Sequence, residues 1–281
     1  MKVCTTKVET RDTIQGFRNS GETIGLVPTM GFLHDGHMTL VKAAQERCDR
    51  VAVSIFVNPT QFGEATDLET YPRNEERDLA MLKQAGVDVV FMPSPAEMYH
   101  PEKQTVVETT KLSRVLMGRL RPGHFRGVAT VVTKLLNIVL PDVAFFGEKD
   151  YQQLQVIKTM VRDLDMPFEI VGVPTVREAD GLAMSSRNVK LTPQDRAAAV
   201  VLSKSLTLAD KVVPQGITAK NLRDEITTFI ANEKRADVRS VDVRDAQTLT
   251  SVRGIIKTPV VVLLAVRFGD VLLIDQRVVS P

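Results

Sequence analysis

The chain has 281 residues, of which 43% are hydrophobic and 25% charged, and its formal net charge is +2. We therefore expect a soluble globular protein with one large and one smaller domain. Near-neutral charge, the lack of Trp and an aromatic content of 5% give no reason to expect a nucleic-acid partner. No apolar run approaches the about 20 residues of a membrane span, and the N-terminus lacks a secretory signal, so we predict a cytoplasmic protein without a membrane partner.

Five apolar runs are typical of strands that are buried on both faces of a sheet, and helical patterns fall between them. The runs cover residues 24–27, 51–57, 87–91, 143–146 and 168–173. Residues 128–139 carry the apolar stripe of a helix that packs on a sheet. This alternation predicts an α/β fold with a doubly wound, Rossmann-like parallel sheet, whose ligands bind beyond the carboxyl ends of the strands.

The pattern changes after about residue 175. Thr192 and Pro193 have the residue types of an N-cap and a first helical position, and they open an alanine-rich helix. A second amphipathic helix follows near residues 217–232, and residues 240–245, 260–266 and 271–274 are typical of short strands. We predict a large domain of residues 1–175 and a smaller C-terminal α+β lid domain of residues 176–281.

The segment after the first strand places two histidines, His34 and His37, on either side of Gly36. The helical pattern that begins at Met38 puts both histidines at a helix N-terminus, where free N–H groups and the helix dipole attract anions. The two histidines could form a phosphate site, or they could lie in a solvated turn. The segment lacks the glycine pattern of a dinucleotide fold, the Lys of a P-loop and the Glu of H-E-x-x-H, so zinc is not expected.

Further polar groups follow other strands. Asn58 and Gln61 come after the second strand and suit a polar, uncharged ligand group, although Asn-Pro also simply makes a turn. One carboxylate of the acidic stretch 67–78 could hold Mg²⁺, while most of that stretch would form a solvated face. The basic loop 121–127 could bind an anion or serve as a mobile turn.

Two later segments also suit phosphate. Gly147 allows close backbone approach, Lys149 supplies a charge, and Asp150 could cap the next helix, which is the ordinary alternative for that segment. Residues 180–188 contain two serines and Arg187 and form a predicted loop. This loop could fold over a triphosphate, or it could be a polar linker.

Several long motifs in one order resemble the pantothenate synthetase (pantoate–β-alanine ligase) family of the HxGH nucleotidyltransferase superfamily. The motifs are VPTMGFLHDGH, IFVNPTQFG, YPR, RPGHFRGV, FFGEKDYQQL, VPTVREADGLAMSSRN and RFGDVLLID. The resemblance implies that ATP, (R)-pantoate and β-alanine are the substrates, that pantoyl adenylate is the intermediate, and that AMP and pyrophosphate are released. It also implies Mg²⁺ as the phosphate counterion and a homodimer.

The resemblance further assigns residues to roles. It implies catalytic roles for His34, His37 and Lys149, with His37 as the proton donor. It places pantoate on Gln61 and Gln153, with Asn58 beside them, and leaves Asp78 as the metal contact, because Arg77 stands where some relatives have a second acid. The residues implied for ATP are Met30, Gly31, Phe32, Leu33, His34, Asp35, Gly36, His37, Gly147, Glu148, Lys149, Asp150, Val176, Met184, Ser185, Ser186 and Arg187.

Two other functions stay open on the sequence. An adenylyl or cytidylyl transferase of the same superfamily would transfer the nucleotide to a phosphate and would not depend on an amine. A nucleotide sensor that has lost turnover would need affinity, but it would not need donors aimed at a transition state. The presence of His34, His37, Lys149 and Arg187 argues against the sensor.

Overall fold

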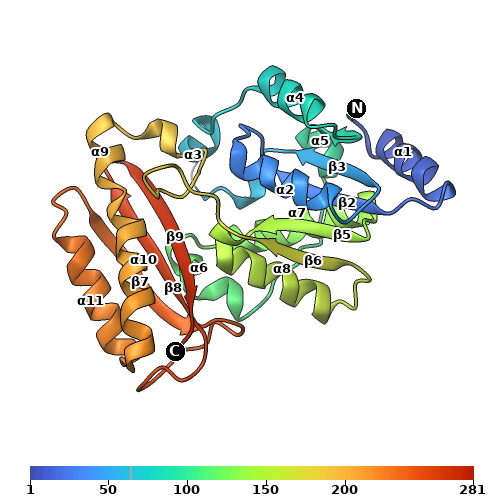
Figure 1. The fold of residues 1–281 in the computed structure, drawn as a ribbon. Helices are drawn as coiled ribbons and strands as arrows, with labels where there is room; N and C mark the ends of the chain where they lie inside the picture. Colours follow the sequence, from blue (N-terminus) through green and yellow to red (C-terminus); the bar gives the residue numbers. More distant parts are fainter. Residues whose placement is uncertain (64) are drawn as a thin grey trace. The chain divides into compact units, whose positions relative to one another are not determined.

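The computed structural model describes residues 1–63 and 65–281, and Figure 1 follows the chain through them. The chain divides into two compact units. The first comprises Met1–Gly147 and Val156–Pro174, and the second comprises Glu148–Gln155 and Thr175–Pro281. Each unit encloses a hydrophobic core of its own.

The first unit contains a parallel sheet with the strand order β1-β4-β3-β2-β5-β6. Its strands are β1 Lys2–Cys4, β2 Ile24–Thr29, β3 Arg50–Ile55, β4 Val89–Phe91, β5 Val143–Gly147 and β6 Glu169–Val173. The predicted parallel α/β sheet is thus confirmed. The short edge strand β1 was not predicted, because three residues with two exposed side chains carry no apolar run.

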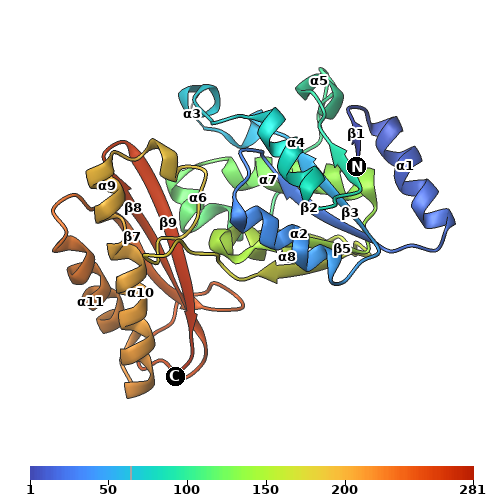
Figure 2. The ribbon, with the colours of Figure 1, turned by 45° about the horizontal axis from the view of Figure 1, so that its top comes forward.

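Helices cover both faces of this sheet (Figure 2). On one face, Leu40 and Val41 of α2 and Leu82 of α4 share a core with alternate strand residues such as Val53 and Val90. On the other face, α1 packs on α7, and the stripe predicted for residues 128–139 lies within α7. The helices of this part of the chain are α1 Lys7–Asn19, α2 Asp35–Gln45, α3 Ala65–Glu69, α4 Glu75–Gln84, α5 Pro95–Met98, α6 Met117–Leu120, α7 His124–Val139 and α8 Tyr151–Asp163, with the 3₁₀ turns η1 Pro59–Gln61, η2 Leu112–Arg114 and η3 Glu148–Asp150.

The strand order reverses at β2, which is the kind of switch point where open α/β sheets bind ligands. The chain continues from β2 to its neighbour β3 on one side, and β5 pairs with β2 on the other. Because the strands are parallel, the carboxyl ends of β3, β2, β5 and β6 lie in a row. Each of these four ends leads into a segment that was singled out in the sequence.

The second unit contains an antiparallel sheet with two helices, α10 and α11, on one face (Figure 1). Thr192 and Thr218 cap α9 and α11 by accepting backbone N–H bonds, as the sequence predicted for Thr192. The predicted alanine-rich helix is in fact two helices, α9 and α10. The elements are α9 Pro193–Ala198, α10 Val201–Val212, α11 Ala219–Ala231, β7 Asp237–Asp245, β8 Val260–Phe268 and β9 Val271–Val279, with η4 Asn188–Lys190 and η5 Val213–Gln215.

Cys4 and Cys48 are buried free thiols. Cys48 packs against Gly25 at the centre of the sheet, where an added Cβ would lie 3.3 Å from its sulfur. Burial raises the pKa of the Cys48 thiol, so this side chain acts as a small apolar group. Within the described ranges 1–63 and 65–281, no helix has the length and apolar character needed to cross a membrane.

We expect Leu136→Ala to destabilise the first unit by about 2–5 kcal/mol, because this side chain is fully buried in α7 and its loss leaves a cavity. The matched control is Leu164→Ala, whose side chain is 50% exposed and whose effect should stay within about 0.5 kcal/mol. Urea unfolding followed by circular dichroism measures both. Equal effects of the two substitutions would contradict the assignment of α7 to the core.

Candidate functional site

The predicted histidine pair lies at the start of α2, with His34 as the N-cap residue. The Nδ1 atom of His34 accepts the Gly36 N–H at 3.2 Å, and Nδ1 of His37 accepts the His34 N–H at 3.3 Å. The ring centroids are 4.1 Å apart. The spacing of three residues therefore serves reciprocal capping of the helix, with imidazoles in place of the usual oxygen acceptors.

This capping fixes where each ring carries its proton. A nitrogen that accepts a backbone N–H cannot itself be protonated, so in the neutral rings of His34 and His37 the proton sits on Nε2. Each ring thus has an N–H donor on the side away from the cap. The geometry suits hydrogen bonding to an anion at the helix N-terminus.

The turn that precedes the histidines has an unusual backbone conformation. Gly31 has φ 79° and Phe32 has φ 50°, a region that residues with a Cβ rarely adopt. The N–H of Phe32 donates to Oδ2 of Asp78 at 2.6 Å, and the N–H of Leu33 donates to Oδ1 of Asp78 at 2.8 Å. Asp78, the predicted metal residue, is 1% exposed and contacts this turn. Asp35, one of the residues implied for ATP, is exposed.

The predicted amide pair lies at the end of β3, around the turn η1. Nδ2 of Asn58 donates to Oε1 of Gln61 at 3.0 Å, which points the amide nitrogen of Gln61 away from Asn58. Nε2 of Gln61 in turn contacts Sδ of Met30 at 3.0 Å. The segments after β2 and β3 therefore meet through Gln61 and Met30.

Three residues that the sequence did not assign to this site hold the amide pair in place. The hydroxyl of Tyr99 donates to Oδ1 of Asn58 at 2.8 Å, and burial raises the pKa of Tyr99, which keeps this donor protonated. Nδ1 of His124 lies 2.8 Å from the carbonyl oxygen of Gln61. A Cβ on Gly127 would lie 2.4 Å from the carbonyl oxygen of Thr60, so α7 can pack against η1 only at a glycine.

The basic segment 121–127 thus has a structural contact with the amide pair. The sequence offered two interpretations of this segment, an anion-binding loop and a mobile turn, and neither included this packing. The sequence signal was the glycine in an otherwise apolar helix, which often marks a close backbone approach. Tyr99 carried no comparable signal.

The segment after β5 begins at Gly147, where a Cβ would meet no atom within 4 Å, so a ligand has room to approach. In the second unit, η3 packs on β9, and the hydroxyl of Tyr151 donates to the carbonyl of Ala246 at 2.8 Å. Nζ of Lys149 lies 3.9 Å from Oδ2 of Asp150. Gln153 is half-buried in the first turn of α8.

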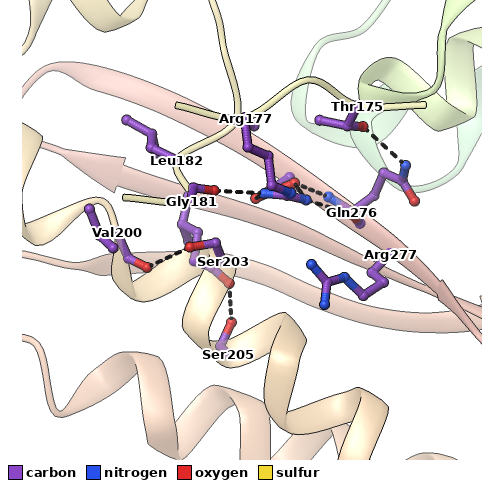
Figure 3. A network of polar contacts seen from close by, with 12 residues as sticks. Thr175, Arg177, Gly181, Leu182, Val200, Ser203, Ser205, Gln276 and Arg277 are labelled. Carbon is purple, nitrogen blue, oxygen red and sulfur yellow. Dashed lines mark hydrogen bonds and ion pairs between the residues drawn. The ribbon is translucent and has the colours of Figure 1, made fainter. Parts of the chain in front are cut away.

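The serine-containing segment follows a narrow hairpin that β9 anchors (Figure 3). Arg177 forms a two-pronged ion pair with Asp275 at 2.7 and 3.0 Å and also donates to the carbonyl of Gly181 at 3.1 Å. Gly181 has φ 94°, and a Cβ there would lie 2.8 Å from Oγ of Ser203. The Asp275 side chain is fully buried, so this pair fixes the hairpin firmly to the strand.

The predicted nucleotide residues lie at the open end of this hairpin. The N–H of Met184 donates to the carbonyl of Val176 at 3.0 Å, which closes the hairpin. Oγ of Ser185 accepts the N–H of Arg187 at 3.2 Å, and Ser186 and Arg187 are half-buried. The chain then turns through η4, so the two serines and Arg187 lie on a short, hydrogen-bonded loop.

The site residues therefore form two groups. In the first unit, Met30 joins the histidine turn to Asn58 and Gln61. In the second unit, the Lys149 segment and the Arg177 hairpin both contact β9. Within the part of the chain that the structure describes, no group of three or more His, Cys, Asp or Glu side chains could hold a metal ion.

The sequence matches the family described as pantoate-beta-alanine ligase over residues 2–278. The pantothenate synthetase of Bartonella henselae is 50% identical over 281 residues, which cover 100% of this chain and 99% of that protein.

Two solved structures are also similar. The pantothenate synthetase of Thermus thermophilus has a TM-score of 0.93 and 42% identity, with 99% of each chain covered. A pantoate-beta-alanine ligase of Francisella tularensis, complexed with beta-gamma ATP and beta-alanine, has a TM-score of 0.79 and 35% identity, with 99% of this chain and 97% of that chain covered. On these matches and the site geometry, the chain belongs to the pantoate-beta-alanine ligase family.

Proposed function

We propose that the chain catalyses the ATP-dependent condensation of (R)-pantoate with β-alanine to pantothenate, through pantoyl adenylate and with release of AMP and pyrophosphate. Family membership supports the overall reaction. The observation that carries the proposal for this site is the contact between the two motifs: the capped histidine pair and Gln61 are joined through Met30 at the switch point of the sheet.

The chemistry explains why ATP is consumed. A carboxylate is a poor electrophile, and its oxygen is a poor leaving group, so pantoate must be activated before an amine can attack it. The pantoate carboxylate attacks the α-phosphate, pyrophosphate leaves, and the amine of β-alanine then attacks the acyl carbon and displaces AMP. No covalent bond to the protein is needed, so catalysis rests on positioning and on stabilising charge in the transition state.

The residues of the first unit have distinct roles in this proposal. The Nε2–H groups of His34 and His37 bind phosphate oxygens, and His37 supplies the proton donor as charge develops. The Gln61 amide, oriented by Asn58, holds pantoate. The turn Met30–Leu33 forms the wall of the nucleotide site.

Other motif residues take the further roles that the family resemblance implies. Lys149 neutralises phosphate charge, with Gly147, Glu148 and Asp150 beside it. Gln153 binds pantoate. Val176 meets the adenine or ribose through its backbone, and the loop of Met184, Ser185, Ser186 and Arg187 closes over the phosphates. These assignments follow the motifs and are supported by the anchoring of both segments to β9.

The described residues do not form a protein cage for Mg²⁺. No three-donor cluster is present among them, and both oxygens of Asp78 accept backbone N–H groups. An ion that accompanies ATP would be held by the phosphates and water, as is common for Mg²⁺. We also propose a homodimer, which the family resemblance implies, and a cytoplasmic location, which the sequence predicts.

The proposed reaction is tested by exchange of labelled pyrophosphate into ATP. We expect exchange that requires pantoate and does not require β-alanine, because adenylation is reversible and precedes amine attack. Exchange that requires a phosphate acceptor in place of pantoate would favour the nucleotidyl transferase. No exchange with any acid, together with tight ATP binding, would favour the sensor.

We expect His37→Ala to lower kcat by about 10²–10³-fold with a smaller change in ATP affinity, the range for loss of one positioned donor. His100→Ala is the control, because His100 is exposed and lies outside both groups of site residues. Steady-state kinetics and ATP titration measure the two effects. Near-normal turnover of the His37 variant would remove this residue from the catalytic assignment.

We expect Gly127→Ala to lower kcat/KM for pantoate by at least about 10-fold, because the new Cβ pushes η1 and Gln61 out of position. The control is Gly16→Ala in α1, where a Cβ meets nothing within 4 Å. That change should keep full activity and stabilise the helix by about 0.5–1 kcal/mol. Unchanged pantoate kinetics in the Gly127 variant would show that η1 does not position the substrate.

A further inference from the structure

We propose that Asp78 is a positioning residue that holds the turn Gly31–Leu33 in shape for the nucleotide site, and that it is not a magnesium ligand. The inference rests on the proposed function, because it concerns the site of that reaction. It differs from the role that the family resemblance implies for Asp78. The atoms that Asp78 contacts carry the argument.

Each carboxylate oxygen of Asp78 accepts one backbone N–H of the turn. Oδ2 accepts the Phe32 N–H at 2.6 Å, and Oδ1 accepts the Leu33 N–H at 2.8 Å. Asp78 is 1% exposed, so water does not compete for these bonds. Hydrogen bonds from N–H groups to an ionised carboxylate are among the stronger ones in proteins.

The turn needs such a partner because its backbone is strained. Phe32 has φ 50°, although it has a Cβ and a bulky ring. Two successive N–H groups in this kind of backbone form a small concave site for an anion. Asp78 occupies that site from inside the protein, which stabilises a conformation that the sequence of the turn does not favour on its own.

The surroundings of Asp78 leave it little freedom to turn toward a metal. A Cβ on Gly31 would lie 3.1 Å from Oδ2 of Asp78 and 3.1 Å from Cγ2 of Ile55, so the carboxylate packs tightly under the turn. The guanidinium of Arg77 lies 5.6 Å from the centre of the Phe32 ring. Two neighbouring residues of α4 thus contact the same turn.

The contact has a consequence for the substrate. The N–H groups of Phe32 and Leu33 are already used, so the ATP phosphates must find other donors. In the proposed function these donors are the Nε2–H groups of His34 and His37, which directly follow the turn in the chain. Asp78 therefore acts through the histidines and does not itself touch the substrate.

The first test needs no variant and no substrate. Hydrogen exchange of single amides should show strong protection of the Phe32 and Leu33 N–H groups in the free protein. Exchange of both amides at the rate of open loop residues would overturn the proposal. Because this readout is independent of turnover, it stands apart from a failure of the proposed function.

The second test is Asp78→Asn, which keeps the shape but replaces one acceptor with an NH₂ group. We expect faster exchange at Phe32 or Leu33 and a fall in kcat of about 10- to 100-fold, with the Mg²⁺ concentration for half-maximal activity unchanged within about twofold. Glu76→Gln removes the same charge from an exposed position on the same helix turn and should change none of these.

A magnesium ligand would behave differently. Loss of a ligand should raise the Mg²⁺ requirement, and excess Mg²⁺ should restore activity to Asp78→Asn. That result, or a variant with wild-type activity and wild-type exchange at both amides, would refute the positioning role.

Discussion

In the proposed function, the N-terminus of α2 has to be capped and yet bind a ligand, and the proposed site depends on how both requirements are met. An uncapped helix end leaves N–H groups without partners, whereas a cap by Asp would place an acceptor-only carboxylate at the proposed phosphate site. His34 and His37 accept the capping N–H bonds through Nδ1, so the proton of each neutral ring lies on Nε2. One side chain thus satisfies the backbone and still presents a donor, which an oxygen cap such as a carboxylate cannot do.

The sheet supplies the second condition, which is that the motif segments begin close together. Reversal of strand order at β2 aligns the ends of β3, β2, β5 and β6, so segments that are far apart in sequence start from adjacent positions. Within the first unit, buried contacts then fix each segment: Asp78 holds the turn after β2, and Tyr99 and Gly127 hold η1 after β3. In the second unit, the Arg177–Asp275 pair does the same for the hairpin.

The fold could be predicted from the sequence because it depends on local patterns. Apolar runs marked the strands, and the histidines followed a run directly, so their place at a helix start was predictable. The domain boundary depended on long-range packing: Pro174 ends the first unit, but Glu148–Gln155 groups with the second, because η3 packs on β9.

The supporting residues could not be predicted for the same reason. Asp78 is 46 residues from Phe32, and Tyr99 is 41 residues from Asn58, so nothing in a local window links either pair. The choice of nitrogen in each imidazole also depends on backbone geometry, which residue types alone do not reveal. The sequence thus indicates candidate functional side chains, whereas the structure shows which residues contact and position them.

Nitrogen-15 NMR of the histidine rings tests the capping account most directly, and with four histidines in the chain the signals can be assigned by single substitutions. The account predicts that, when neutral, His34 and His37 are both protonated on Nε2, and that a non-hydrolysable ATP analogue shifts the Nε2 signals of both rings. A proton on Nδ1 in either neutral ring, or Nε2 signals that do not shift when the nucleotide is added, would contradict this account.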